Sequence, residues 1–480
     1  MDFKNARFIG QGFNAGQIEA LTKMEEFYCN PAKKVFTLSG AAGTGKTFII
    51  RYFLDNIVKH SVCVTAPTHK AVRVIEGMTG RKGRTLQSLH GLRPNVNLDT
   101  FNIDNVKFDL LGEPQIKNYY LVIIDEGSMI NSHLYDLNLL RAKQYTVKII
   151  FIGDKFQLPP VKERISKCFT NNEGYELTEI VRQEKNNPLI KLLTIVRNDV
   201  KCASNSFLTY LKDNKSDIVN DVGYEVVNEI EFKARIHDIF NNKEFEKNVD
   251  FVRFTSWTNA DIKKWNKYIR DDLLNKPTEI VSKDDLFTGY STIVDDYFKP
   301  TIVNSDDYIV DDLEIRKSDY GFKVYYVVLK SLGSLSMSIV NIVDHTDKTF
   351  SIYYNYLNNL HFNAIYSVAH EKGKRWREYY DFKNRYLSLI DFNLFNKGDI
   401  KVRGKVTKDL DYGYGLTTHK SQGSTYNNVF INLKNIIYYE RDNKLIPISN
   451  NNNNPYAIEF RNKLTYVALS RASKKAIILL

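Results

Sequence analysis

The first part of the chain, about 200 residues long, repeats one pattern: a short run of β-branched and aliphatic residues, a loop, and a segment of helical pattern. Four such runs stand out, at Val35–Leu38, Val62–Thr65, Leu121–Ile124 and Val147–Ile152. Nearly continuous apolar runs that alternate with helices are typical of parallel strands buried on both faces. The pattern therefore predicts an α/β domain whose functional residues lie at the carboxyl ends of the strands.

The pattern changes between about Asp284 and Lys401. Segments such as YGFKVYYVVLK and KTFSIYYNYL are rich in Tyr, Val and Ile, which predicts a small antiparallel β module. The segment EKGKRWREYYDFKNRYLSLIDF, which follows, is predicted to form a charged, aromatic helix. From Tyr412 to Leu480 the α/β pattern returns. A β-rich insertion within a second α/β domain fits this order better than three domains in tandem.

Composition limits the class of protein. Hydrophobic residues make up 43% and charged residues 26% of the 480 residues, which argues against a mostly disordered chain. No apolar run approaches the ~18–20 residues that span a bilayer, and the N-terminus is not a signal peptide. The four cysteines (Cys29, Cys63, Cys168 and Cys202) form no CxxC pair, which argues against zinc fingers, iron–sulfur clusters and disulfide scaffolds. We therefore expect a reduced, intracellular, soluble protein without a membrane partner.

The balance of charge favours a polyanionic partner without proving one. The net charge is +11 and the pI is near 9.1. A basic excess speeds encounter with nucleic acid. The chain is also rich in Lys, Asn, Ile, Tyr and Phe, as expected from an AT-rich genome, and that composition alone could raise the pI.

A phosphate-binding motif lies in VFTLSGAAGTGKTFII, which matches GxxxxGK(S/T) between a predicted strand and a predicted helix. Gly40, Gly43 and Gly45 allow the tight turn that aims backbone N–H groups and the helix N-terminus at a phosphate. Lys46 can reach the β- and γ-phosphates, and the Thr47 hydroxyl can ligate Mg²⁺. The motif predicts a nucleoside triphosphate site.

Two further strand ends supply polar groups for the same site. In YYLVIIDEGSM, Asp125 is placed to hold Mg²⁺ and Glu126 to orient or deprotonate the attacking water. In GDKFQLPPV, Asp154 and Gln157 could sense a γ-phosphate. Together the motifs predict Mg-dependent nucleotide hydrolysis, although they do not give its purpose.

The order of these motifs resembles superfamily 1 helicases, and more narrowly their 5′→3′ branch of RecD-type and Dda-like phage enzymes. The resemblance runs from near Phe13 to the C-terminus and is weakest between about Asn198 and Asp250. It implies an α/β fold of two RecA-like P-loop domains with ATP between them, and the polarity rests on it entirely. The implied domains are 1–198 for domain 1A with a β-hairpin pin insertion at 91–118, 199–283 and 402–480 for domain 2A, and 284–401 for an SH3-like β module with a helical arm, called 2B.

The resemblance also assigns the nucleotide site. FNAGQIEA resembles the adenine-recognition motif with Gln17, ELTEIVRQEKNNP resembles motif IV with Arg182 at the γ-phosphate, and YVALSRASKKAIIL resembles motif VI with Arg471 as the arginine finger. The implied nucleotide-binding residues are Gln17, Gly40, Gly43, Thr44, Gly45, Lys46, Thr47 and Gly423. The implied catalytic residues are Lys46, Glu126, Gln157, Arg182 and Arg471, and the implied Mg²⁺ ligands are Thr47 and Asp125.

Four further segments resemble loops that contact the nucleic acid strand in this family: TAPTHKAV, TLQSLHGL, FTSWTNADIKKWN and the motif V segment YGLTTHKSQGSTYNNVFI. The implied contacts are Thr65, Pro67, Thr68, His69, Lys70, His90, Trp257, Asn259, Thr418, His419 and Lys420. Two alternatives stay open, since His90 alone could be a hydrogen-bonded loop histidine and Trp257 could pack in a core.

The predicted pin would carry an aromatic wedge that meets the separating base pair. NVKF puts Phe108 at the matching place, with Phe101 as the second choice. An aromatic wedge has a physical basis because every base has a face to stack on. The competing interpretation, in which Phe108 packs into the first domain, is equally open. The helix around Trp376 resembles the arm that braces the pin, and we assign no contacts to it.

We therefore expect an ATP-dependent DNA helicase that uses ATP and Mg²⁺ and acts as a monomer on single-stranded and forked DNA. A single-stranded-DNA-binding protein or replisome components are candidate partners. The Asn- and Lys-rich composition with a Dda-like layout suggests a phage protein in the host cytoplasm. The alternatives are an RNA-directed helicase and an ATP-switched translocase subunit of a recombination complex. The sequence shows no nuclease cluster or relaxase metal motif, which weakens the last of these.

Overall fold

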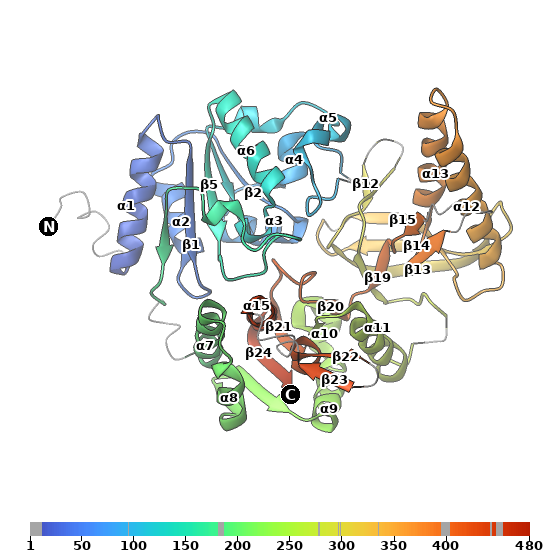
Figure 1. The fold of residues 1–480 in the computed structure, drawn as a ribbon. Coiled ribbons are helices and arrows are strands. Elements are labelled where there is room, and N and C mark those ends of the chain that lie inside the picture. The colour runs from blue at the N-terminus through green and yellow to red at the C-terminus, as the bar shows by residue number, and fades with distance from the viewer. Residues whose placement is uncertain are drawn as a thin grey trace. The chain divides into compact units, whose positions relative to one another are not determined.

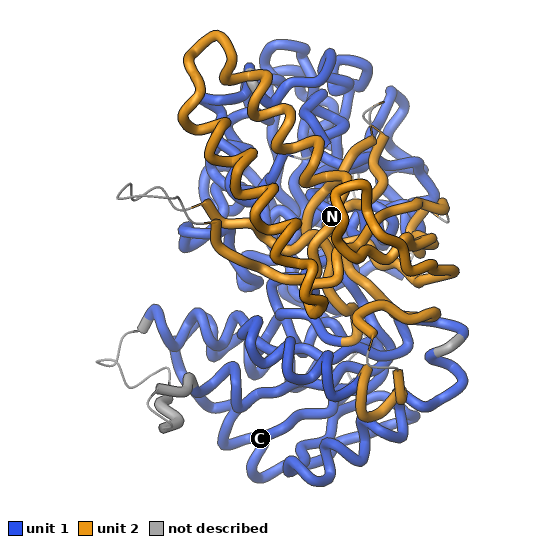
Figure 2. Tube along the Cα trace, turned by 90° about the vertical axis from the view of Figure 1, so that its right-hand side faces the viewer, with its two compact units in different colours: residues 1–269, 415–480 blue, residues 270–414 orange. Residues whose placement is uncertain are grey.

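The chain forms two compact units in a computed structural model that describes residues 12–94, 96–180, 187–276, 279–295, 297, 299–334, 336–394, 404–441, 444–447 and 455–480. Unit 1 comprises residues 1–269 and 415–480, and unit 2 comprises residues 270–414 (Figure 2). Within the described ranges, every helix is too short or too polar to cross a membrane.

Unit 1 contains two lobes. The first lobe is built on a six-stranded parallel sheet with the order β3-β2-β4-β5-β1-β6, of which β1, β2 and β5 are labelled in Figure 1. Its strands are β1 (Val35–Gly40), β2 (Val62–Ala66), β3 (Gly83–Thr85), β4 (Leu121–Ile124), β5 (Lys148–Gly153) and β6 (Gly174–Leu177). Its helices are α1 (Ala15–Cys29), α2 (Lys46–Asn56), α3 (His69–Thr79), α4 (Leu86–His90), α5 (Val106–Asp109) and α6 (Ser132–Tyr145). The four predicted strands and the parallel α/β fold are confirmed.

The central strands of this sheet are apolar throughout because both of their faces are buried. Successive side chains of a strand point to opposite faces. Ile123 and Ile150 therefore pack in one core with α1 and α2, while Val122 and Ile149 pack in another core with α4 and α6. This arrangement brings the ends of β1, β4 and β5 together at one edge of the sheet.

The second lobe contains a sheet with the order β20-β9-β21-β24-β8-β7, parallel except for the β7–β8 pair. Its strands are β7 (Ser216–Val219), β8 (Val222–Val227), β9 (Val252–Ser256), β20 (Gly415–Thr417), β21 (Tyr426–Asn432) and β24 (Ala472–Leu479), with a ribbon of β22 (Tyr438–Arg441) and β23 (Lys444–Pro447). Its helices are α7 (Pro188–Cys202), α8 (Ser206–Asp213), α9 (Glu229–Phe240), α10 (Lys243–Lys247), α11 (Asn259–Lys267), α14 (Leu433–Ile437) and α15 (Pro455–Leu469).

Helix α7 belongs to the second lobe. Its apolar stripe, which includes Leu189, Leu192 and Val196, packs in one core with Val429 and Leu464 of the second lobe. The domain boundary predicted after residue 198 therefore falls inside a helix, and the division between the lobes precedes α7. The spacing of apolar residues predicts which face of a helix is buried, but it does not say which sheet covers that face.

Unit 2 is the predicted β-rich insertion, although it is wider than the predicted range 284–401 at both ends. Its main sheet has the order β16-β15-β14-β13-β10-β19 and is antiparallel except for the β15–β16 pair. Its strands are β10 (Leu286–Gly289), β11 (Ile293–Val294), β12 (Pro300–Ile302), β13 (Asp307–Lys317), β14 (Lys323–Ser331), β15 (Met337–Val343), β16 (Tyr386–Leu387), β17 (Phe392–Leu394), β18 (Gly404–Val406) and β19 (Leu410–Tyr412). Its helices are α12 (Phe350–Tyr366) and α13 (Lys372–Arg385). The SH3-like character of the module stays a prediction.

The segment KTFSIYYNYL, predicted as part of the β module, instead begins helix α12. Tyr353, Leu357, His361 and Ala364 are buried, and this spacing of four, four and three residues marks one face of a helix. The abundance of tyrosine favoured a strand locally, and packing against α13 outweighed that preference. The predicted charged, aromatic helix is α13.

The pin segment 91–118 also differs from its prediction. Its described residues form helix α5, two 3₁₀ turns and one isolated antiparallel bridge between Leu92 and Leu110, with no hairpin. One reason is local capping, since the Asn102 side chain accepts a hydrogen bond from the Asp104 N–H and starts a helical turn. Phe101 is 3% exposed in the core of the first lobe, so it is not a wedge. Phe108 lies in α5, and its side chain is outside the described part of the chain.

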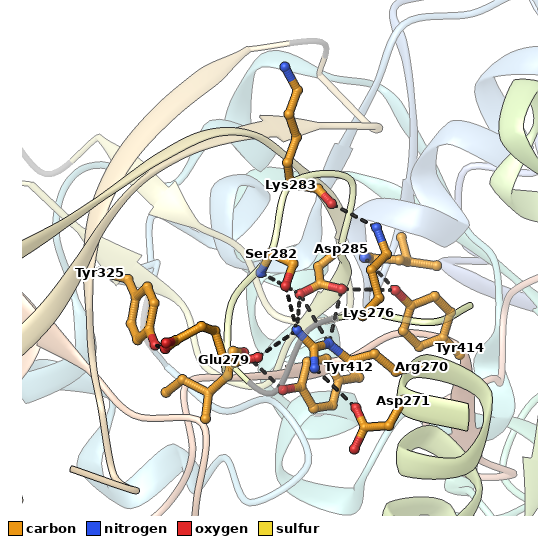
Figure 3. Close-up of polar contacts among 12 residues, drawn as sticks. Arg270, Asp271, Lys276, Glu279, Ser282, Lys283, Asp285, Tyr325, Tyr412 and Tyr414 are labelled. Atoms are coloured by element: carbon orange, nitrogen blue, oxygen red, sulfur yellow. Dashed lines mark hydrogen bonds and ion pairs between the residues drawn. The ribbon is translucent and has the colours of Figure 1, made fainter. Parts of the chain in front are cut away.

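A buried ion pair stabilises the part of unit 2 where the chain enters and leaves it (Figure 3). Arg270 donates hydrogen bonds to Asp285 at 2.8–3.1 Å, and both side chains are almost completely buried. Tyr414 donates to Asp285 at 3.2 Å, and Tyr412 donates to the Ile280 carbonyl at 2.8 Å. The pair therefore joins the first residues of the unit to its last ones.

The ends of unit 1 that flank the insertion also meet. The Asn266 side chain of α11 accepts a hydrogen bond from the Gly415 N–H at 2.6 Å and donates to the Gly415 carbonyl at 3.3 Å. Gly415 begins β20, which pairs in parallel with β9, the strand before α11. The insertion thus leaves and rejoins the second lobe at adjacent points.

Candidate functional site

The phosphate loop joins β1 to α2 at the carboxyl edge of the first sheet. Gly43 and Gly45 have φ angles of 77° and 79°, a left-handed conformation that favours glycine. A Cβ at Gly40 would lie 3.0 Å from the Leu177 backbone oxygen, so this position also requires glycine. The Thr44 hydroxyl donates to the Ala41 carbonyl at 2.9 Å and fixes the turn from inside. The loop therefore has the geometry that its motif predicts.

Lys46, the first residue of α2, lies inside this loop. Its ammonium group donates to the Gly40 and Ala41 carbonyls at 2.7 and 2.9 Å. Burial lowers the pKa of Lys46, and the nearby carboxylates of Asp154 and Asp125 oppose that shift. A half-buried cation held beside backbone N–H groups is suited to bind an anion.

Asp125 and Glu126 follow β4 at the same edge. The Asp125 carboxylate accepts the Glu126 N–H at 2.8 Å. Glu126 has a φ of 55°, a strained conformation for a residue with a side chain. Burial, with the adjacent Asp125 charge, raises the pKa of Glu126 to about 7, while the charges of Arg471 and Lys46 act in the opposite direction. A carboxyl group with such a pKa is suited to accept a proton near neutral pH.

A cavity of about 180 Å³ lies between the two lobes of unit 1. Predicted site residues that line it are Lys46, Thr47, Asp125, Glu126, Gln157, Gly423 and Arg471. Asp154 also lines it. The structure therefore brings together residues that are as much as 425 positions apart in the sequence, from both lobes.

Arg471 reaches this cavity from the end of α15. It is 5% exposed, and its guanidinium donates to the Ser424 carbonyl at 2.8 Å and the Ser470 hydroxyl at 2.9 Å. Gly423 has a φ of 75°, and a Cβ there would lie 3.3 Å from the Ala71 Cβ. A fixed guanidinium beside a phosphate-binding loop can stabilise negative charge on a transferring phosphoryl group.

Two second-lobe side chains at this edge reach the first lobe: Gln422, which belongs to the motif V loop, and Tyr466, which was not predicted as a site residue. Gln422 donates to the Ser128 hydroxyl at 3.0 Å, and Tyr466 donates to the Asp154 carboxylate at 2.6 Å. Gln422 lies within motif V and Tyr466 within motif VI. The spacing of residues in a single sequence does not show that their side chains reach the first lobe.

Gln17 contacts the phosphate loop. Its side-chain amide donates to the Thr44 carbonyl at 3.2 Å and accepts the Asn14 N–H at 3.1 Å, and the residue is 3% exposed. These bonds fix the start of α1 against the loop, and the adenine-reading role stays a prediction. Arg182 lies outside the described residues.

The donors in the cavity fit a hard divalent cation. The Thr47 hydroxyl and the Asp125 carboxylate supply oxygen ligands, which Mg²⁺ prefers. Within the described ranges, no group of three or more His, Cys, Asp or Glu side chains could hold a metal ion. Since Mg²⁺ usually keeps several waters and binds substrate phosphates, two protein ligands are consistent with it.

The predicted nucleic acid contacts divide by exposure. His69, Asn259 and His419 are exposed, Thr68, Trp257 and Lys420 are half-buried, and Thr65, Pro67, Lys70, His90 and Thr418 are buried. The structure thus leaves about half of these side chains accessible to a strand, whereas the buried ones contact protein.

Lys70 and Thr418 show what the buried side chains do. The Lys70 ammonium donates to the Tyr426 hydroxyl at 3.1 Å and lies 3.6 Å from the Asp250 carboxylate, so it contacts the second lobe. The Thr418 hydroxyl donates to the Ser256 carbonyl at 3.2 Å. Both side chains are committed to packing in this structure, which disfavours them as strand contacts.

His90 is a core residue. It is fully buried, its Nε2 lies 3.0 Å from Asn138 Oδ1, and burial lowers its pKa to about 4. A neutral, buried imidazole cannot contact a phosphate backbone, so the alternative interpretation of His90 as a hydrogen-bonded histidine is the correct one. Trp257 is half-buried and packs edge-on against Phe460, with 6.3 Å between the ring centroids, which agrees with a packing role.

The burial of His90 predicts a loss of stability in acid. Its folded pKa of about 4 lies below the ordinary 6.5, so the unfolded chain binds more protons between these values. Stability from this group is complete above pH 6.5 and is lost as the pH falls towards 4. At about 1.4 kcal/mol per pKa unit, lowering the pH from 7 to 5 should cost roughly 2 kcal/mol through His90.

Urea unfolding of the wild type and of His90→Gln at pH 7 and pH 5 measures this cost. Glutamine removes the titration but keeps an amide for Asn138, so the variant should lose less stability than the wild type over this range. Equal losses in both proteins would contradict the prediction, because the remaining titrating groups are the same.

Comparison with known proteins finds one matching domain family and several similar proteins. The AAA domain family matches residues 12–213. The chain is 26% identical to the uncharacterized protein R530 of Acanthamoeba polyphaga mimivirus, over 88% of this chain and 94% of that protein. It is 27% identical to the ATP-dependent DNA helicase Dda of Enterobacteria phage T4, over 53% of this chain and 57% of Dda.

A third relative is the ATP-dependent DNA helicase Pif1 of Campylobacter jejuni, which is 30% identical over 32% of this chain and 35% of that protein. The chain therefore spans little more than half of Dda and about a third of this Pif1 protein. The match to the AAA domain covers the phosphate loop and both strand ends that line the cavity. In sequence, the chain is therefore similar to the AAA domain family over residues 12–213 and to the ATP-dependent DNA helicases Dda and Pif1 over part of their length.

Proposed function

We propose that this chain is an ATP-dependent DNA helicase that translocates 5′→3′ along single-stranded DNA and separates duplex strands. The observation that carries the proposal is the cavity in which Lys46 and Glu126 of the first lobe meet Arg471 of the second. Because the site needs both lobes, nucleotide turnover and movement between the lobes are linked, and alternating grip on a strand would convert each cycle into a step. The DNA substrate and the polarity rest on the similarity to Dda and Pif1.

Each side chain has a distinct part in the proposed hydrolysis. Lys46 and the glycine loop bind the phosphates, Glu126 accepts a proton from the attacking water, and Arg471 stabilises the charge that develops on the γ-phosphoryl group. Gln157 orients the γ-phosphate, and Arg182 is assigned the same region. Thr47 and Asp125 would hold Mg²⁺, which supplies charge neutralisation on the phosphate oxygens.

The proposed strand path uses the accessible side chains. His69, Asn259 and His419 are exposed at loops or helix starts that follow strands of the two sheets. Half-buried Thr68, Trp257 and Lys420 are the secondary candidates. Phe108 stays the proposed wedge on the resemblance of its segment to the pin of related helicases.

The remaining assignments are also proposals. Single-stranded and forked DNA are the proposed substrates, and a single-stranded-DNA-binding protein or replisome components are the proposed partners of a monomeric enzyme. The similarities to a phage protein and a giant-virus protein support a viral source. We propose the host cytoplasm as its location.

An unwinding assay with ATP and Mg²⁺ tests the function directly. Duplexes that carry a 5′ or a 3′ single-stranded tail are compared, with DNA and RNA tails in parallel. Displacement of the 5′-tailed DNA duplex alone is the expected result. Displacement from the 3′ tail would overturn the polarity, and preference for the RNA tail would favour the RNA-directed alternative. Strand-stimulated ATPase without displacement would favour a translocase that needs a partner.

A further inference from the structure

Tyr466 extends from the second lobe into the first. Its hydroxyl donates to Asp154 Oδ2 at 2.6 Å and accepts the Ala42 N–H of the phosphate loop at 3.5 Å. The residue is 1% exposed and lies in the last turn of α15, five positions before Arg471. A single hydroxyl therefore joins the helix that precedes Arg471 to two parts of the nucleotide site.

Asp154 organises the turn that carries Gln157. One carboxylate oxygen of Asp154 accepts the Phe156 N–H at 3.0 Å, and the Asp154 carbonyl accepts the Gln157 N–H at 3.1 Å. The other carboxylate oxygen is the one that Tyr466 contacts. A shift of the Tyr466 hydroxyl would therefore displace the Asp154 carboxylate and, with it, the turn that places Gln157 against the cavity.

The charge on Asp154 is balanced separately. Arg197 of α7 lies 3.6 Å from Asp154 and 3.1 Å from Glu176. Burial, with the Asp154 charge, raises the pKa of Tyr466 far above its ordinary value, so the phenol stays a donor at any working pH. Because the cation supplies the countercharge, the contribution of Tyr466 is a directed hydrogen bond.

Arg471 follows the end of α15 and is hydrogen-bonded to that helix. Arg471 Nε donates to the Val467 carbonyl at 3.2 Å, one residue beyond Tyr466. When the second lobe moves, the Arg471 guanidinium and the Tyr466 hydroxyl must move together. The position of the Arg471 guanidinium and the conformation of the Gln157 turn therefore depend on the same helix end.

We propose that Tyr466 is a positioning residue that couples the arrival of Arg471 to the alignment of the Gln157 turn and the phosphate loop. The inference deepens the proposed ATPase function and rests on it. Tyr466 acts through Asp154 and Ala42 and does not touch the reacting phosphate. Its loss should therefore lower the rate of hydrolysis more than the affinity for nucleotide.

Tyr466→Phe tests this inference, since it removes only the hydroxyl and keeps the ring in the core. A buried hydrogen bond to a charged group contributes enough to change a rate by about tenfold or more when it acts in the transition state. We expect kcat of the DNA-stimulated ATPase to fall about tenfold or more, while the Kd for a fluorescent ADP analogue changes by less than about threefold. Tyr224→Phe is the matched control, because Tyr224 is equally buried in the same core and lies on β8 of the second lobe. It should leave kcat unchanged.

A second readout excludes a general structural effect. If Tyr466 acts in part through the Gln157 turn, Tyr466→Phe combined with Gln157→Ala should lose less activity than the two single losses multiplied together. An unchanged kcat in Tyr466→Phe, an equal loss of affinity and kcat, or additive losses in the double variant would each overturn the inference. A wild-type chain without any DNA-stimulated turnover would instead overturn the proposed function itself.

Discussion

Arg471→Ala is expected to lower kcat for ATP hydrolysis by about 10³–10⁵-fold while nucleotide affinity changes little, since an arginine finger acts mainly on transition-state charge. Arg471 lines the cavity beside Glu126 and is held by hydrogen bonds to Ser424 and Ser470. Its charge also lies close enough to Glu126 to oppose the rise in that carboxyl group's pKa. Single-turnover hydrolysis and binding of a fluorescent ADP analogue measure the two effects separately.

Two control variants accompany Arg471→Ala. Arg471→Lys keeps the charge but not the planar fork, so it should recover only part of the rate. Arg235→Ala removes an exposed arginine of the same unit that pairs with Glu225, and it should leave the rate unchanged. If Arg471→Ala reduced affinity and rate by the same factor, Arg471 would be a ground-state binding residue and not a finger.

Asp285→Ala is expected to destabilise unit 2 by about 3–5 kcal/mol, because it removes the buried carboxylate to which Arg270 donates and leaves Arg270 paired with the partly exposed Asp271. The same change removes the acceptor of the Tyr414 hydroxyl. Nucleotide binding should persist, since every residue that lines the cavity belongs to unit 1. Hydrogen exchange measured by mass spectrometry should show faster opening in residues 270–414 than in the rest of the chain.

The matched rescue replaces both charges at once. Arg270→Met with Asp285→Leu should recover most of the stability, because an apolar pair of similar volume carries no desolvation cost. Breaking the Arg235–Glu225 pair, whose arginine is exposed, with Glu225→Ala should cost less than about 1 kcal/mol. A loss below that size in Asp285→Ala would show that the buried pair does not support unit 2.

The phosphate loop and the strands of the first lobe could be predicted from the sequence because their signals are local. Three glycines, a lysine and an apolar run set both the backbone conformation and the chemistry within 16 residues of VFTLSGAAGTGKTFII. Helix α12 was missed because tyrosines at helical spacing also suit a strand, and only packing against α13 decides between them.

Burial explains most of the errors at the site. Lys70 and Thr418 match strand-contacting motifs, yet their side chains end on Tyr426 and on the Ser256 carbonyl. Which polar residues become buried depends on how the lobes pack, and no motif carries that information. For the same reason the sequence did not single out Tyr466, whose partners lie more than 300 residues away along the chain.

The contact between Asn266 and Gly415 bears on how this fold tolerates changes in its insertion. Because one asparagine closes the gap where the chain leaves and rejoins the second lobe, the order of strands in that sheet does not depend on what is inserted there. A module at this point can be enlarged, shortened or exchanged as a cassette while the nucleotide site keeps all of its parts. Diversity between relatives of this chain should therefore concentrate in the insertion.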